Sequence, residues 1–458
     1  MDIFILVVFI LGYAFIALEH NIRVDKAASA LLTGTLCWAL FVLGWHEVPA
    51  HLAEDYQLFS AEHNGTGHGG VAQFFEHRLL HHMEEISSIL FFLLGAMTIV
   101  ELVDAHEGFR VITDRIQTRN KVKMLWIVCI LTFFFSALLD NLTTSIVMVS
   151  LLRKLISDRQ TRWLFAGMVV IAANAGGAWS PIGDVTTTML WIGGQLTTST
   201  IITNLIFPSV VCLLVPLFAL SFRLQGEIDR PASDEEEEWD PTTPFERNLV
   251  FAAGVLGLLF VPLFKTVTHL PPFMGMMLSL GALWMLTERL HHSKNVEEKA
   301  HLTVIGVLRK IDTASVLFFL GILLAVASLQ EAGHLLFAAD WLRTSLNDVY
   351  LIDLAIGLLS AIVDNVPLVA ASMGMYDVVP SAAVTDAWSS MFVQDGIFWQ
   401  FLAYCAGTGG SALIIGSAAG VAVMGLERID FVWYLKKISL LAILGYFAGA
   451  GVYLLMFA

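Results

Sequence analysis

The sequence predicts an all-α polytopic membrane protein with two inverted-topology repeats, each containing a re-entrant helical hairpin and a broken transmembrane helix. Three observations lead to this fold class. The chain is 57% hydrophobic and only 14% charged, and apolar stretches near or above the ~18 residues that span a bilayer recur along it. Two of these stretches carry the same polar motif. The basic residues fall in places that predict which segments cross the membrane.

The repeated motif places an aspartate inside an apolar run in each half of the chain. Residues 136–141 (SALLDN) recur as residues 360–365 (SAIVDN). An ionisable residue near the bilayer centre costs roughly 2.5–3.5 kcal/mol on insertion scales, so such residues are functional candidates by default. The same cost borne twice, in the same local sequence, indicates an internally duplicated transporter.

Composition also excludes several classes of protein. The formal charge of −15 and the absence of a basic recognition motif argue against nucleic-acid binding. The four cysteines lie in apolar segments without pairing or metal spacing and are interpreted as small packing residues: Cys37, Cys129, Cys212 and Cys405. The N-terminal apolar segment lacks the basic region and cleavage site of a signal peptide, so we expect the first helix to be retained.

Ten segments are predicted to cross the membrane. They are 3–18, 27–44, 86–104, 163–197, 201–222, 248–264, 272–288, 312–330, 398–427 and 431–457. The apolar segment 124–152 is different, because the residues before it and after it are both strongly basic, which places both on the cytoplasmic side. A re-entrant hairpin with Asp140 near its tip satisfies that condition. Its first limb, 124–139, would rise about 24 Å.

The segment 350–376 is predicted to be the mirror image of the first hairpin. Between residues 331 and 397 Arg343 is the only basic residue, against eight acidic ones, so both flanks are expected outside the cytoplasm. With this threading 22 of the 25 lysines and arginines are cytoplasmic, and both termini are extracytoplasmic.

The two repeats are predicted at 1–222 and 248–458, joined by an acidic cytoplasmic linker at 223–247. Each repeat has three helices, a hairpin, a broken helix (163–197 or 398–427) and a final helix, so five crossings invert the second repeat. Interrupted helices at equivalent places in inverted repeats point to a transporter's binding site. Residues 234–238 of the linker are all acidic; a solvated tether is the favoured interpretation and a cation antenna the alternative.

Polar residues at the hairpin tips and helix breaks form the predicted ion site. The first cluster contains Asp140, Asn141, Thr143, Asn174, Ser180 and Asp184. The second contains Asp364, Asn365, Thr408, Ser411 and Ser417. Carboxylate, amide and hydroxyl oxygens suit sodium, lithium or another hard cation. Neither cluster contains Lys or Arg, which an anion carrier would use. Desolvation strengthens proton binding to a buried carboxylate and a bound cation weakens it, so the two ions would compete.

At this point the sequence resembles a known family. Residues 90–106 (LFFLLGAMTIVELVDAH), with Asp140, Asn141 and the stretch 174–184, are similar to the NhaD-type sodium/proton antiporters of the ion transporter superfamily. The resemblance spans nearly the whole chain. It implies efflux of sodium or lithium against proton entry, with no resident cofactor. It also implies a multi-pass protein of the bacterial inner membrane, and a homodimer by resemblance alone. The same superfamily includes arsenite and dicarboxylate carriers, which remain the alternative. Dicarboxylate relatives carry Ser-Asn-Thr at the hairpin tips, where this chain has Asp-Asn.

Each candidate residue also has a purely structural interpretation. Asn141, Asn365 and Asp184 could cap helices, which is compatible with ion binding. Glu101, Asp104 and His106 lie near a helix end and could simply be solvated. Seven histidines lie between residues 46 and 82; a solvated outer loop is the favoured interpretation and pH sensing the alternative. An intramembrane hydrolase lacks a nucleophile or metal constellation, and a passive channel would not need inverted gates.

Overall fold

The computed structural model describes residues 2–17, 19–44, 48–63, 70–110, 116, 118–229, 242–292, 294 and 301–458. Within these residues the secondary structure is helical, apart from turns and one isolated β-bridge between Asn120 and Glu227. The all-α class predicted from the sequence is confirmed. The acidic residues 234–238 of the linker, and the histidines at 46 and 68, lie outside the described residues.

Seven helices among the described residues are long and apolar enough to cross a membrane. They are Lys26–Gly44, Val71–Ala105, Lys121–Leu139, Thr198–Ser221, Pro244–Thr268, Thr313–Glu331 and Ser439–Phe457. Shorter apolar helices include Ile3–Ile16 and Val349–Leu359. This pattern is that of a multi-pass membrane protein.

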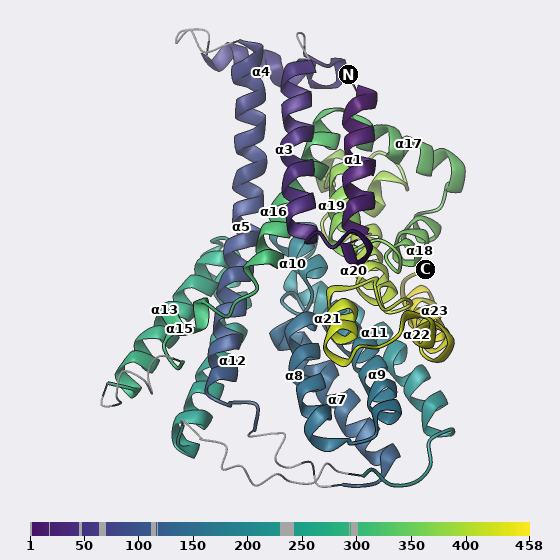
Figure 1. Ribbon diagram of the computed structural model, residues 1–458. Coiled ribbons are helices and arrows are strands. Elements are labelled where there is room, and N and C mark those ends of the chain that lie inside the picture. Colours follow the sequence, from purple (N-terminus) through teal and green to yellow (C-terminus); the bar gives the residue numbers. More distant parts are fainter. Residues whose placement is uncertain are drawn as a thin grey trace. The chain divides into compact units, whose positions relative to one another are not determined.

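The chain divides into two compact units, each of which draws helices from both halves of the sequence. The first unit comprises residues 1–91, 312–348 and 366–377. Its helices, of which Figure 1 labels all but α2 and η1, are α1 (Asp2–Ala17), α2 (Glu19–Ile22), α3 (Lys26–Gly44), η1 (Ala50–Leu52), α4 (Ala53–His63), the first part of α5 (Val71–Ala105), α16 (Thr313–Glu331), α17 (His334–Leu346) and α19 (Asn365–Met375).

Helices α3 and α16 pack closely in the first unit because glycines lie at their crossing. A Cβ atom on Gly321 would lie within 2.7 Å of the backbone of Ala30, so a larger residue there would force the helices apart. The indole of Trp38 on α3 donates a hydrogen bond to the carbonyl of Leu324 on α16 (2.9 Å). Small residues that allow backbone contact are the usual means of packing helices in membranes.

The histidine-rich segment is largely helical, which corrects our expectation of a solvated loop. Residues 53–63 form α4, and α5 begins at Val71 rather than near residue 86. The first turns of α5 are fixed by Glu331, a buried carboxylate. Arg78 donates to it from Nε (3.0 Å) and Nη2 (2.6 Å), and His82 Nε2 lies 2.7 Å from Oε1. Burial of a carboxylate requires such partners, and they come from this part of α5.

The second unit contains the remaining residues, 92–311, 349–365 and 378–458. Besides the rest of α5, its helices are α7 (Lys121–Leu139), α8 (Asn141–Leu155), α9 (Arg159–Ala178), α10 (Val185–Ile192), α11 (Thr198–Ser221), α12 (Pro244–Thr268), α13 (Pro272–Leu290), α15 (Val304–Leu308), α18 (Val349–Leu359), η2 (Ser381–Ala383), η3 (Ser389–Phe392), α20 (Ile397–Gly409), α21 (Ala418–Glu427), α22 (Phe431–Lys437) and α23 (Ser439–Phe457).

The two ends of the α7–α8 pair lie beside the same short piece of the linker. Ile228 N donates to Arg119 O (2.7 Å) just before α7, and Ser157 N donates to Asp229 O (2.9 Å) just after α8. Helix α7 therefore begins beside this linker segment, the chain turns at Asp140, and α8 ends beside the same segment. The helices rise about 28 Å and 22 Å from their lengths.

Candidate functional site

The turn between α7 and α8 is made by an aspartate in an unusual backbone conformation. Asp140 has φ 80° and ψ 159°, a region that is essentially restricted to glycine. Its carboxylate caps α8: Oδ1 accepts from the Thr143 backbone N–H and Oδ2 from the Thr143 hydroxyl, both at 2.8 Å. A non-glycine residue held in such a conformation is a reason to look for function at this tip.

The second carboxylate lies at the break between α9 and α10. Helix α9 ends at Ala178 and α10 begins at Val185, after glycines and Pro181 that interrupt the helix. Asp184 is only 2% exposed and caps α10, because its Oδ1 accepts from the backbone N–H (3.0 Å) and hydroxyl (2.9 Å) of Thr186. The capping role considered for Asp184 from the sequence is therefore present.

Two asparagines join the hairpin tip to both helix breaks. Asn141 Nδ2 donates to Asp184 Oδ2 (2.7 Å) and to Asn174 Oδ1 (3.1 Å). Asn174 Nδ2 in turn donates to the hydroxyls of Ser411 and Ser417, each at 2.9 Å. Members of the two clusters that we predicted as separate are thus joined in one buried network, with Asn174 as the bridge.

The equivalent residues of the second motif, Asp364 and Asn365, lie in the second unit just before and at the start of α19. Asn365 begins α19 and is 3% exposed, and its Nδ2 has no hydrogen-bond partner among the described residues. Asp364 precedes it, and both Asp364 and Asp140 interact electrostatically with Asp184. The charges of three aspartates, at positions 140, 184 and 364, therefore influence one another in this region.

Three of the predicted residues have their hydroxyls engaged beside the network. Thr143 caps α8 with Asp140, as described above. The hydroxyl of Ser180 donates to Ala137 O (2.5 Å), and that of Thr408 donates to Tyr404 O (2.6 Å). In this conformation these contacts position the hairpin and α20, and the oxygens of Ser180 and Thr408 keep lone pairs that could accept a ligand.

Several hydroxyls missed by the sequence analysis lie next to the predicted residues. Thr144, Ser145 and Thr187 are buried, and their hydroxyls have no hydrogen-bond partner among the residues that the structure describes. Buried polar atoms of this kind call for an explanation, and an ion is one. Their signal in the sequence is the run of Thr and Ser directly after each aspartate, at 143–145 and 186–188.

The network is rich in oxygen, and no basic side chain among the described residues forms a hydrogen bond with its aspartates. Each hydrogen bond to Asp140 or Asp184 comes from an amide or a hydroxyl. Lys265 lies elsewhere: its Nζ donates to the carbonyl of Trp191 (2.6 Å) at the C-terminal end of α10. In the described part of the chain no group of three or more His, Cys, Asp or Glu side chains could hold a metal. The arrangement thus offers two carboxylates with neutral oxygen ligands.

The acidic and histidine residues at the end of α5 are not part of this network. Asp104 is exposed, whereas His106 is buried and its Nε2 lies 2.8 Å from Nε2 of His291. Burial lowers the pKa of His106, against a smaller opposing effect of its hydrogen bond to Leu102 O, so the ring stays neutral at ordinary pH. The expectation of a solvated side chain is therefore wrong for His106.

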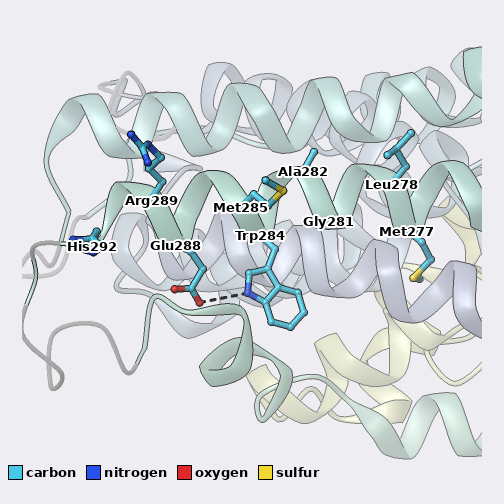
Figure 2. A pocket seen from close by; sticks show the side chains of 9 residues that line it. All are labelled: Met277, Leu278, Gly281, Ala282, Trp284, Met285, Glu288, Arg289 and His292. Carbon is cyan, nitrogen blue, oxygen red and sulfur yellow. Dashed lines mark hydrogen bonds between the residues drawn. The ribbon is translucent and has the colours of Figure 1, made fainter.

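A hollow along one helix of the second unit contains no predicted site residue. Figure 2 shows that its lining side chains come from α13 and the residues just after it, including Met285, Trp284 and Glu288. Trp284 Nε1 donates to Glu288 Oε1 (3.4 Å) within the same helix. A mostly apolar face on one helix does not offer the converging polar groups that an ion site needs.

Comparisons with known proteins agree with the chemistry of this network. A family model described as "Citrate transporter" matches residues 5–393. The chain is 46% identical to "Sodium/proton antiporter 1" of Arabidopsis thaliana over 99% of this chain and 72% of the relative. It is 44% identical to "Sodium/proton antiporter 2" of the same plant over 97% of each. It is also 30% identical to "Na(+)/H(+) antiporter NhaD" of Vibrio cholerae over 98% of this chain and 91% of the relative.

Proposed function

The chain belongs to the NhaD-type antiporters of the ion transporter superfamily, and from this premise we propose that it exchanges cytoplasmic sodium or lithium for external protons through the Asp140–Asp184 network. It is a multi-pass secondary transporter, not an enzyme. One observation carries the proposed site: buried Asp184 and half-buried Asp140 accept hydrogen bonds from amide and hydroxyl groups, and no basic residue is among their partners in the described part of the chain. Hard cations select such oxygen ligands.

The network also suggests how sodium would replace internal hydrogen bonds. Asn141 uses its amide N–H groups on Asp184 and Asn174. A cation placed between these groups would need the Asn141 carbonyl oxygen instead, which a rotation of the amide supplies. The unpartnered hydroxyls of Thr144 and Thr187 provide further oxygens nearby. Asp140, Asn141, Asn174 and Asp184 are therefore the core of the proposed site, with Thr143 and Ser180 positioning it.

Competition between sodium and protons for the same carboxylates would produce the exchange. An empty buried carboxylate without a counter-charge favours protonation, and a bound cation favours the ionised form. Alternating access would then expose the aspartates first to one side of the membrane and then to the other. Sodium would be released outside, and protons would be released into the cytoplasm. Asp364, Asn365, Thr408 and Ser411 are proposed to extend the ligand set from the second half of the chain.

The inverted repeat that this mechanism needs is supported by equivalent contacts in the two halves. Ser136 Oγ donates to Ala173 O (2.6 Å), and Ser360 Oγ donates to Ala406 O (3.2 Å). A Cβ on Gly183 would meet Ala137 Cα at 3.0 Å, and a Cβ on Gly416 would meet Ala361 Cα at 2.7 Å. Repeats at 1–222 and 248–458, with hairpins at 124–152 and 350–376, remain our proposal.

The proposed threading can be tested by labelling the two flanks of the first hairpin. Both flanks contact linker residues 226–229, which supports their lying on one side of the membrane. Cysteines at Thr118 and Gln160, in a cysteine-free background, should react with an impermeant reagent only from the cytoplasm. Labelling from opposite faces would replace the hairpin with an ordinary span. The bacterial inner membrane, extracytoplasmic termini and a homodimer remain predictions, since relatives come from plants as well as bacteria.

Carboxylate transport is the second candidate, because the matching family model is described as a citrate transporter. A carboxylate substrate would require basic groups or free N–H donors, whereas the network presents aspartates at positions 140 and 184. The two candidates separate in proteoliposomes with an imposed gradient and an internal pH dye. Sodium or lithium gradients should drive proton movement; potassium, arsenite and citrate gradients should not. Proton movement driven by citrate alone would reverse the assignment.

A further inference from the structure

Asp353 is a buried carboxyl group that the proposed sodium network does not use. It lies in the middle of α18, the first limb of the second hairpin, and is 0% exposed. Neither of its carboxylate oxygens has a hydrogen-bond partner among the described residues. An ionised carboxylate in that position would have neither a donor nor a counter-ion, which is among the most costly states for a buried group.

Tight helix packing keeps water away from this face of α18. Gly357 follows Asp353 by four residues, so both lie on the same face of the helix. A Cβ on Gly357 would meet Cys405 O at 2.7 Å, and a Cβ on Gly409 would collide with Gly357 O. Helices α18 and α20 are therefore in backbone contact one turn from Asp353.

Among the described residues, the titratable groups that interact with Asp353 are tyrosines and cysteines on packed helices. Cys405, Tyr446 and Tyr453 interact with it electrostatically. Tyr350 lies one turn earlier on α18, and Tyr404 on α20 packs near Cys212 of α11. These side chains are ordinarily neutral near pH 7 and supply no positive charge.

The neighbouring hydroxyl groups already donate to other acceptors. Tyr446 donates to Leu354 O (3.0 Å), and Tyr453 donates to Gln400 Oε1 (3.2 Å). Tyr404 donates to Tyr446 O (2.8 Å). Each phenol has only one hydrogen to donate, so none of the three can also stabilise a carboxylate. The packing seen here is compatible with Asp353 as the neutral carboxylic acid.

We propose that Asp353 is a second proton-binding site of the exchange cycle, separate from the carboxylates that bind sodium. The bound proton permits α18 to pack against α20, and its release to water requires the two helices to separate. Protonation and hairpin packing are then linked, because each favours the other. This inference rests on the proposed antiport function and assigns one of its protons to a residue outside the sodium network.

The test compares Asp353→Asn with Asp348→Asn in the full-length protein reconstituted in proteoliposomes. Asparagine mimics the neutral acid and cannot cycle a proton, whereas Asp348 is an exposed carboxylate near the start of the same helix. The proton-to-sodium ratio is obtained from the sodium gradient that just balances an imposed pH gradient. We expect one proton fewer per transport cycle in Asp353→Asn and no change in Asp348→Asn. An unchanged ratio would make Asp353 a permanently neutral structural acid and overturn the proposal.

Infrared difference spectra on changing pH or sodium give a readout that does not need transport. The carbonyl band of a protonated carboxyl group should respond in the wild type and lose one component in Asp353→Asn. An identical response in both proteins would overturn the proposal. If Asp353→Asn is not recovered as folded protein, Asp353→Ser takes its place in both measurements. Failure of the proposed antiport itself would differ, since the wild type would then show no sodium-driven proton movement.

Discussion

At the tip of the first motif Asn141 donates hydrogen bonds to Asn174 and Asp184, whereas at the tip of the second motif the amide nitrogen of Asn365 has no partner among the described residues. The two tips share the same sequence motif, yet only Asp140 has a positive φ among the described residues of the two motifs. The first tip thus has an unusual backbone conformation and internal hydrogen bonds, whereas at the second tip the amide nitrogen of Asn365 is buried and unbonded within the described residues. Similar local sequences therefore give two tips that differ in backbone conformation and hydrogen bonding.

The largest expected effect comes from removing the carboxylates at the tips. Asp140→Asn and Asp364→Asn should each keep the fold, because asparagine can accept similar hydrogen bonds, but one or both should lose sodium-driven proton movement. An amide cannot take up and release a proton in this cycle, so we expect at least one of the two to be irreplaceable. Transport is measured in proteoliposomes with a pH dye.

Asp377→Asn is the matched control for these variants, because Asp377 is an exposed carboxylate after α19. It should transport like the wild type. Wild-type exchange rates in both tip variants would show that neither carboxylate belongs to the site. Loss in Asp140→Asn alone would identify the assembled tip as the essential one and sharpen the comparison between the tips.

The next effect is the pH dependence of sodium binding. If protons and sodium share the carboxylates, apparent sodium affinity should weaken by up to about tenfold per pH unit on the acid side, or about 1.36 kcal/mol per competing proton. The dissociation constant is measured by calorimetry on purified protein over about pH 5.5–9. A constant that does not vary over this range would exclude shared carboxylates. Reversal of the sodium gradient should also reverse transport, since one pathway serves both ions.

Replacing the asparagine at each tip should separate the effect on fold stability from the effect on sodium binding. Asn141→Ala leaves Asp184 Oδ2 and Asn174 Oδ1 without a donor, which should destabilise the fold by about 1–3 kcal/mol. Asn365→Ala removes an amide whose nitrogen has no hydrogen-bond partner among the described residues, so its cost in stability should be smaller. Thermal unfolding in detergent measures fold stability without sodium, and the shift on adding sodium measures binding. Equal losses in the two variants would mean that the second tip is bonded as well as the first.

Much of this site could be anticipated from the sequence because its parts are local. The SALLDN motif and the glycines with Pro181 mark where helices end, and polar residues at such breaks must face protein or a cavity. The bridge from Asn174 to Ser411 and Ser417 could not be anticipated, since it joins residues more than 230 positions apart. No local pattern encodes which of two nearby polar clusters an amide will reach.

The helical start of α5 was missed for the same physical reason. Residues 71–82 are rich in histidine and charge, which locally resembles a solvated loop. Arg78 and His82 are instead held by Glu331, about 250 residues later in the chain. The buried carboxylate of Glu331 lies on α16, so the partner of these two side chains depends on how α16 packs.

The smallest expected effect concerns backbone strain at the two tips. Asp140 occupies a glycine-type conformation that costs on the order of 1–3 kcal/mol. Asp140→Gly removes that strain but also removes the cap on α8, which contributes roughly 1 kcal/mol. Its thermal stability should therefore remain close to that of the wild type. Asp140→Ala is the matched variant, because alanine loses the same cap and keeps the strain, and it should unfold at a lower temperature. At Asp364, where φ is not positive, Asp364→Gly should be no more stable than Asp364→Ala, since glycine adds only chain entropy to the unfolded state.

Equal stability of Asp140→Gly and Asp140→Ala would show that the first tip stores no strain. The contrast between the tips would then rest on hydrogen bonding alone.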